Sequence, residues 1–403
     1  LNTGRSLFAI ERQGQEIPAE HALLGEVLKE NGYETFGSGK WHNGKTAFNR
    51  SFTDGDSIFF GGMHDHWNVP LNHYDPTAKY ESKTKKIFDF RNENKPAEYI
   101  ADHVRSGEHS TDIIAQTIID FLDRKHDKPF YAYASFLAPH DPRTMPQEFR
   151  DMYDEEKIKI PPNFMSYHPI EYGHTYGRDE ILAPYPRTIQ DTKRQLSEYF
   201  AMITHIDYQV GRILDKLEEI GEKDNTIIIY AADNGLALGQ HGMFGKQNLY
   251  EHSVRVPLIF SGKGIEKNVK TDSLVYLYDI FPTLCDILEI KKPDSVLGQS
   301  FANVLADNSE KARECLYLSY IDKIRAVTKN GYKYMEHRHE GLHTCQLFNV
   351  EKDPYETMNL YYDENSQDIL KDLQLELATQ ADTIYEKNNE FGKTYWNSVA
   401  EVN

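Results

Sequence analysis

The sequence predicts an α/β fold with a mostly parallel central sheet sandwiched by helices, followed by a smaller C-terminal antiparallel α+β subdomain. Two observations support this prediction. As far as about residue 308, short apolar runs alternate with longer segments of helical periodicity, which indicates βαβ units and a parallel sheet. Beyond that point the segments alternate apolar and polar residues, which is typical of antiparallel strands. We therefore expect one domain over residues 1–308 and another over 309–403.

The first half of the chain contains two predicted helices and two predicted strands. Apolar residues recur at helical spacing over 22–31 and stop at Asn31-Gly32, and 34–40 follows as a short strand. A second helix is expected over 111–124, with Thr111 as its cap. The apolar and aromatic run 130–138 is typical of a buried central strand.

The second half repeats this alternation before the pattern changes. We expect a long amphipathic helix over 199–221, strands at 225–233 and 256–262, and a helix within 274–288. In the C-terminal part Asn330-Gly331 predicts a hairpin turn, and a closing helix is expected over 369–386. Long polar insertions at 61–95 and 161–187 show little periodicity, and loops of that length are usually functional or disordered.

Composition excludes several function classes. The net charge of −18 argues against a nucleic-acid partner, and no apolar run approaches the roughly 20 residues that cross a bilayer, so we expect no membrane partner. The three cysteines Cys285, Cys315 and Cys345 have no metal-type spacing and indicate neither a disulfide framework nor a zinc site. The chain starts at Leu1 without an initiator methionine, so the lack of a signal segment carries no information about compartment.

Unusual polar residues follow three of the predicted strands. Lys40 and His42 follow the first strand, and they are either a solvated basic loop or a pair of groups that face one anion. Because strand carboxyl ends gather at one edge of a parallel sheet, we favour the anion site. Gly37 and Gly39 would let the backbone turn so that both side chains reach the pocket.

The second strand end carries His140 between two prolines, followed by Asp141 and Arg143. A histidine held in this way at a strand end is a candidate for ligand contact. Arg143 could hold a substrate carboxylate bidentately, although a structural salt bridge is the commoner role of such an arginine.

The third strand end carries Asp233 and Asn234, whose oxygens suit Ca²⁺, and less well Mg²⁺. The alternative for this Asp-Asn-Gly sequence is an ordinary β-turn. A glycine-rich loop with His241 and Lys246 follows, and this combination favours the metal and anion site.

Four segments, taken in order, resemble the type I sulfatases of the alkaline phosphatase superfamily: "GSGKWHNG", "LAPHDP", "ADNG" and "GQHGMFGK". The opening "LNTGRS" resembles the end of that family's nucleophile motif, and "LFNVEKDPYETMNL" is similar to a C-terminal stretch common there. The resemblance covers essentially the whole chain and implies an alkaline-phosphatase-like fold.

The resemblance also implies roles for individual residues. Lys40 would bridge nucleophile and sulfate, and His42 would contact the nucleophile's hydroxyl. His140 and Lys246 would bind sulfate oxygens, with His140 protonating the leaving alcohol. The remaining expected residues are the calcium ligands Asp233 and Asn234 and the substrate contacts Asp141, Arg143 and His241.

The family's nucleophile is a formylglycine made from Cys or Ser, and with two further Asp ligands it would lie before Leu1. No Cys-x-Pro-x-Arg or Ser-x-Pro-x-Arg occurs in the chain. The resemblance therefore implies an N-terminally truncated sequence that is inactive by itself and exposes a hydrophobic strand edge unless an N-terminal piece pairs with it.

The function expected from these features is hydrolysis of a sulfuric ester on a sulfated saccharide, by a periplasmic or secreted enzyme with one Ca²⁺ per site. The aromatic and His-rich stretches 63–75 and 167–180 suit sugar rings, or equally a lid packed on itself. The alternatives are a phosphate or phosphonate ester hydrolase of the same superfamily, and a glycan-binding protein without a nucleophile.

Overall fold

The computed structural model describes residues 1–10, 16–86, 97–173, 175–384 and 386–400. At its centre lies a parallel sheet of β1 (Glu34–Lys40), β2 (Asp54–Phe59) and β7 (Phe130–Ser135), in the order β2-β1-β7. A second, antiparallel pair is formed by β8 (Ile228–Ala231) and β9 (Leu258–Ser261). The sequence predicted β1, β7, β8 and β9 but not β2, and it did not predict that β9 runs antiparallel to β8.

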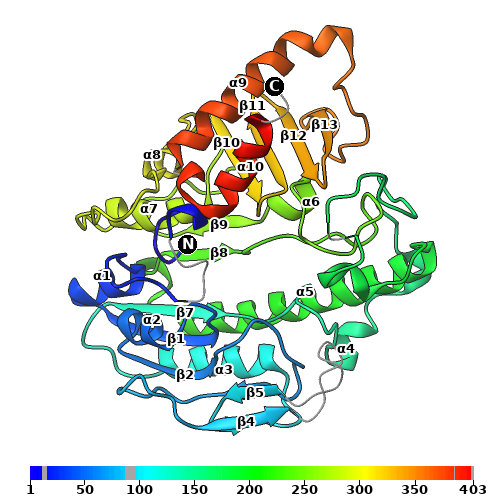
Figure 1. Ribbon diagram of the computed structural model, residues 1–403. Coiled ribbons are helices and arrows are strands. Elements are labelled where there is room, and N and C mark those ends of the chain that lie inside the picture. The colour runs from blue at the N-terminus through cyan, green and yellow to red at the C-terminus, as the bar shows by residue number, and fades with distance from the viewer. Residues whose placement is uncertain (11–15, 87–96, 174, 385, 401–403) are drawn as a thin grey trace.

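Helices cover the central strands (Figure 1). The stacked rings of Phe36 on β1 and Phe121 on α3, with centroids 4.4 Å apart, show how the helices are held. Each ring of this kind is buried at a gain of about 1.5–3 kcal/mol. The helices of this part are α1 (Leu24–Glu30), α2 (Lys45–Ser51), α3 (Ser110–Leu122), α4 (Gln147–Arg150), α5 (Ile189–Glu219), α6 (Glu251–Val254), α7 (Ile280–Ile287) and α8 (Ala302–Ala306).

The start of α3 differs by one residue from the predicted cap. The helix begins at Ser110, and the Nδ1 atom of His109 accepts the backbone N–H of Thr111 at 3.2 Å. A ring nitrogen thus performs the role that a hydroxyl usually takes at a helix start. Thr111 lies within the first turn and is buried.

The C-terminal part is an antiparallel sheet, as predicted, and its four strands lie in sequential order. Asn330 and Gly331 both have positive φ, +51° and +74°, which is the conformation of a type I′ hairpin turn. The boundary at residue 308 stays a prediction. The elements are β10 (Cys315–Tyr320), β11 (Ile324–Lys329), β12 (Tyr332–His339), β13 (Leu342–Asn349), α9 (Gln367–Thr383) and α10 (Glu390–Ala400).

The insertion expected to lack periodicity contains short strands where it is described; residues 87–96 lie outside the described part. Antiparallel pairs are formed by β3 (Pro70–Leu71) with β6 (His103–Val104), and by β4 (Lys83–Lys86) with β5 (Ala97–Ile100). The backbone of Asn72 bonds to that of Ile58 in both directions at 2.9 Å, so the insertion lies against β2. The second insertion contains a short 3-10 helix at Arg178–Leu182.

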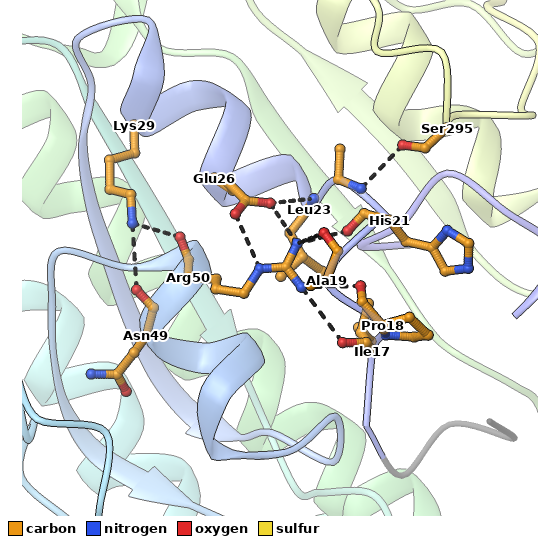
Figure 2. Close-up of polar contacts among 11 residues, drawn as sticks. Ile17, Pro18, Ala19, His21, Leu23, Glu26, Lys29, Asn49, Arg50 and Ser295 are labelled. Atoms are coloured by element: carbon orange, nitrogen blue, oxygen red, sulfur yellow. Dashed lines mark hydrogen bonds and ion pairs between the residues drawn. The ribbon is translucent and has the colours of Figure 1, made fainter. Parts of the chain in front are cut away.

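Arg50 on α2 holds the segment before α1 in place (Figure 2). Its guanidinium donates to both carboxylate oxygens of Glu26, at 3.0 and 2.8 Å, and to the carbonyl of His21 at 2.8 Å. Because the two Glu26 contacts are bidentate and charge-assisted, this pair fixes direction as well as distance. Arg50 therefore fixes the segment that leads through α1 into the first strand of the central sheet.

A cavity of about 1600 Å³ separates β7 from β8 and is lined by residues of both strands. Among the described residues, β7 pairs with β1 alone and β8 pairs with β9 alone. The facing edges of β7 and β8 consequently carry backbone groups without a strand partner in the part of the chain that the structure describes. Polar residues at the ends of these strands also line the cavity.

Candidate active site

Seven of the nine predicted site residues line this one cavity. They come from the ends of β1, β7 and β8 and from the loop after β8, although up to about two hundred residues separate them in the chain. The seven are Lys40, His42, His140, Asp141, Asp233, Asn234 and Lys246.

Lys40 and His42 are directed by the residue between them. Trp41 is 2% exposed and packs edge-on against Phe48 and Phe52, while its backbone N–H donates to Phe59 at 2.9 Å. Because Trp41 is anchored in the core, the residues on either side of it are free to face the cavity.

Gly37 and Gly39 do not form the flexible turn that the sequence suggested. Both lie inside β1 and are buried. Gly39 has φ +91°, and a Cβ there would lie 2.0 Å from the carbonyl oxygen of Ser135 on β7. The glycine is needed because two backbones approach closely, one residue before Lys40.

The charges in the cavity favour an anion. Burial lowers the pKa of Lys40, Asp233 opposes that shift, and the charge of Lys246 adds to it. Burial and then the charge of Lys40 lower the pKa of His42. Because the two ammonium groups repel each other, a negative group bound between them would lower their electrostatic free energy.

His140 is held by three neighbours. Its Nε2 atom lies 2.9 Å from the Nζ atom of Lys246, and its Nδ1 atom lies 3.0 Å from a carboxylate oxygen of Asp141. Since Lys246 can only donate, Nε2 accepts and Nδ1 carries the proton that bonds to Asp141. Asp141 is thus placed to orient His140, which differs from the substrate contact predicted for it.

The third neighbour is His66, which sequence reasoning did not select. Its Nε2 atom lies 2.9 Å from the carbonyl oxygen of His140 and its Nδ1 atom 2.8 Å from the hydroxyl of Ser110. His66 is fully buried, and burial lowers its pKa. The stretch 63–75 therefore places a histidine in the protein interior, where it holds the backbone of His140.

Asp179 is a second residue that the sequence did not reveal. Its carboxylate lies 3.7 Å from the Nζ atom of Lys246 and accepts a hydrogen bond from the amide of Gln247 at 3.1 Å. Asp179 is 6% exposed and comes from the insertion 161–187, so this insertion reaches the site. Asp179 can be recognised as part of the site only from its contacts in the folded structure.

Asp233 and Asn234 fit a hard cation by their chemistry. Asp233 accepts the backbone N–H of Asn234 at 2.9 Å, and the side-chain NH₂ of Asn234 donates to Gly235 at 2.9 Å. With its NH₂ engaged, Asn234 presents its amide oxygen as a ligand. Two ligands are fewer than the six to eight of Ca²⁺, so other oxygens would have to complete the set.

The remaining two predicted residues lie elsewhere. His241 is 7% exposed and stacks on Tyr250 at 4.1 Å, facing the C-terminal sheet, and burial lowers its pKa to about 4. Arg143 donates to Gln195 on α5. Neither side chain lines the cavity, so the geometry does not support substrate contact by either.

The structure is an α/β protein whose sheet is flanked by helices and whose strand ends and following loop bring two lysines, two histidines and the oxygen groups of Asp233 and Asn234 to one cavity. The chain belongs to the sulfatase family, whose family model, described as Sulfatase, matches residues 2–290. A model described as N-sulphoglucosamine sulphohydrolase, C-terminal, matches residues 239–383.

Curated relatives carry sulfatase names. An arylsulfatase of Clostridium perfringens is 32% identical over 260 residues, which cover 62% of this chain and 53% of the relative. An N-acetylglucosamine-6-O-sulfatase of Bacteroides thetaiotaomicron is 23% identical over 83% of this chain and 68% of the relative. The chain thus spans about half the length of the first relative.

Solved structures share the fold. BT4656, solved in complex with its substrate D-glucosamine-2-N,6-O-disulfate, superposes with TM-score 0.73 at 21% identity over 97% of this chain and 87% of that one. The phosphonate monoester hydrolase of Silicibacter pomeroyi superposes with TM-score 0.69 at 15% identity over 94% and 84%. These likenesses establish the architecture and confirm the predicted fold class.

No helix within the described ranges combines the length and apolar character that a membrane crossing requires.

Proposed function

We propose that this protein removes sulfate from a sulfated carbohydrate. The observation that supports it best is the cavity in which Lys40, Lys246 and the oriented imidazole of His140 face one space. The named activity of the Bacteroides relative and the bound sulfated glucosamine of BT4656 supply the substrate class.

The roles of the chain's own residues follow from charge. Sulfate ester cleavage places negative charge on the bridging oxygen, and an acid that protonates this oxygen lowers the barrier. When the anion replaces Lys246 beside Nε2 of His140, the ring can carry a proton on both nitrogens: Nδ1 stays bonded to Asp141, and Nε2 donates its proton to the bridging oxygen. Lys40 and Lys246 stabilise the sulfate oxygens, which is electrostatic stabilisation in a partly desolvated site.

In this proposal Asp233 and Asn234 hold Ca²⁺, with Mg²⁺ as the poorer fit. A bound metal of this kind supplies Lewis-acid polarisation of a sulfate oxygen. The nucleophile in this proposal would be a formylglycine, and His42 would contact its hydroxyl group. The enzyme works in the periplasm or outside the cell, as glycan substrates would require.

A phosphate or phosphonate ester hydrolase is the second candidate, because the fold is shared with a phosphonate monoester hydrolase and the cations would serve either tetrahedral anion. Turnover of an aryl sulfate and the matching aryl phosphate, measured in parallel on protein that includes the upstream segment, separates the two. We expect the sulfate ester to be preferred by kcat/KM. Preference for the phosphate ester would overturn the proposal, and glycan binding without any turnover would indicate the binding protein.

A further inference from the structure

Two histidines and two aspartates meet on the surface where the insertion lies against the sheet. Asp56 is on β2, His73 follows β3, and Asp102 and His103 are at the start of β6. The ligand atoms of Asp56, His73 and His103 all lie within 4.8 Å of one another. None of these residues lines the cavity of the candidate active site.

The contacts within the group hold its side chains together at the surface. The Nδ1 atom of His73 lies 2.8 Å from a carboxylate oxygen of Asp56, and the rings of His73 and His103 stack with centroids 4.3 Å apart. The side chains of His73 and Asp56 are 67% and 41% exposed, so an ion can reach them from solvent.

Asp102 prepares His103 as a ligand. One carboxylate oxygen of Asp102 bonds to the Nδ1 atom of His103, and the other accepts the backbone N–H of His73 at 3.0 Å. A carboxylate on Nδ1 selects the tautomer whose Nε2 lone pair is open, which is the usual arrangement behind a metal-binding histidine.

We propose that Asp56, His73 and His103 bind one Zn²⁺, with Asp102 as the positioning residue behind His103. Two imidazoles and one carboxylate suit zinc, and also Cu²⁺ or Ni²⁺, whereas Ca²⁺ prefers an all-oxygen set. A water molecule completes the fourth position. The site stands whether or not sulfate esters are the substrate.

The ion would join three separate pieces of chain. Asp56 belongs to β2 of the central sheet, His73 lies two residues after β3, and His103 belongs to β6, the strand that pairs with β3. The same insertion carries His66, which bonds to the carbonyl of His140. Zinc therefore clamps the insertion to the sheet, and it stabilises the folded protein by binding the native arrangement alone.

The test is calorimetric titration of the tag-free full chain with Zn²⁺ in excess Ca²⁺, which blocks the hard-oxygen site. We expect one equivalent to bind and to raise the melting temperature. His73→Ala should weaken binding at least tenfold, and it should still fold because this side chain is largely exposed. Asp102→Asn should weaken binding roughly 10- to 100-fold. Equal affinity in His73→Ala and the parent overturns the proposal.

A second cluster, of Glu336, His343 and Cys345, supplies the matched control. Co²⁺ bound at Asp56, His73 and His103 gives visible absorption without a thiolate charge-transfer band. Cys345→Ser should therefore leave Zn²⁺ affinity and the Co²⁺ spectrum unchanged. A thiolate band that disappears in Cys345→Ser would place the metal at the second cluster and overturn the proposal.

Discussion

The Nζ atom of Lys246 lies 2.9 Å from the Nε2 atom of His140, so a lysine from the loop after β8 meets a histidine from the end of β7. The ammonium group bonds to the imidazole in the free protein, and an incoming anion would take its place. Lys246 and His140 are therefore already in position in the free protein, and on binding each replaces its contact with the other by a contact with the anion.

Lys246→Met is expected to lower kcat/KM for an aryl sulfate by about 10²–10³, the usual cost of losing one charge-stabilising donor. Steady-state kinetics on the protein with its upstream segment measure this. A matched control exists in the C-terminal sheet, where Lys323 lies 3.0 Å from His339 in the same kind of pair. Lys323→Met should keep full activity, and an equal loss in both variants would contradict the assignment.

Asp141→Asn should lower kcat by about 10²-fold with little change in KM. The neutral amide can accept only a weaker hydrogen bond from Nδ1 of His140 and does not stabilise a protonated imidazole as a carboxylate does, so the acid is weakened while the lysines still bind sulfate. Circular dichroism should be unchanged. A rise in KM with kcat unchanged would instead support the originally predicted role of Asp141 as a substrate contact.

Gly39→Ala should prevent normal packing of β1 on β7, because its Cβ would meet Ser135 at 2.0 Å. Gly32→Ala is the matched control: Gly32 has nearly the same φ, +89°, with no heavy atom within 4 Å of the added Cβ. We expect about 1–2 kcal/mol of destabilisation at Gly32 from backbone strain, and at least about 1–3 kcal/mol more at Gly39 from the clash. Urea unfolding measures both, and equal losses would rule out the clash.

Ca²⁺ should raise the melting temperature of the protein, and Asp233→Ala should abolish that rise while a chelator reverses it in the parent. The effect follows from binding to the folded state. Asp382 serves as the control, since its carboxylate is largely exposed, pairs with Lys387 and does not line the cavity. If Ca²⁺ still raised the melting temperature of Asp233→Ala, the ion would have to bind at a different site.

The protein should lose stability in acid through three buried histidines beside Tyr250. Burial lowers the pKa of His168 and His241 to about 4 and of His337 to about 3. Each has a ring nitrogen without a hydrogen-bond partner among the described residues. Because the folded pKa values lie below the unfolded value near 6.5, the stabilisation is complete above about pH 6.5 and is lost as pH falls toward 4.

Urea unfolding between pH 7.5 and 4.5 tests this, with an expected slope of about 1.4 kcal/mol per pH unit for each histidine. His168→Gln should reduce the slope by about 1.4 kcal/mol per pH unit in that range. A flat profile would show that these imidazoles titrate alike in the folded and unfolded chains.

The predictable part of the site came from local patterns. Apolar runs located β1, β7 and β8, and the rule that polar residues gather at strand ends then grouped Lys40, His140 and Asp233. His66 could not be found in this way, because its bond to His140 joins residues 74 positions apart. Asp179 was missed for the same reason.

His241 was misplaced because it is near Lys246 in sequence. His241 and Gly242 both have positive φ, +51° and +75°, so the chain reverses between the two side chains. His241 turns toward the C-terminal sheet and Lys246 toward the cavity. Such reversals depend on backbone conformations that residue types alone do not specify.

The cavity between β7 and β8 divides the anion site between two bodies. Lys40 and His140 belong to the sheet on one side, and Asp233 and Lys246 belong to the strand pair on the other. A strand is about 4.8 Å wide, so a segment that paired with the edge of β7 or β8 would fix how far apart these two groups of residues lie. The distance between the groups that face the anion therefore depends on what packs between β7 and β8.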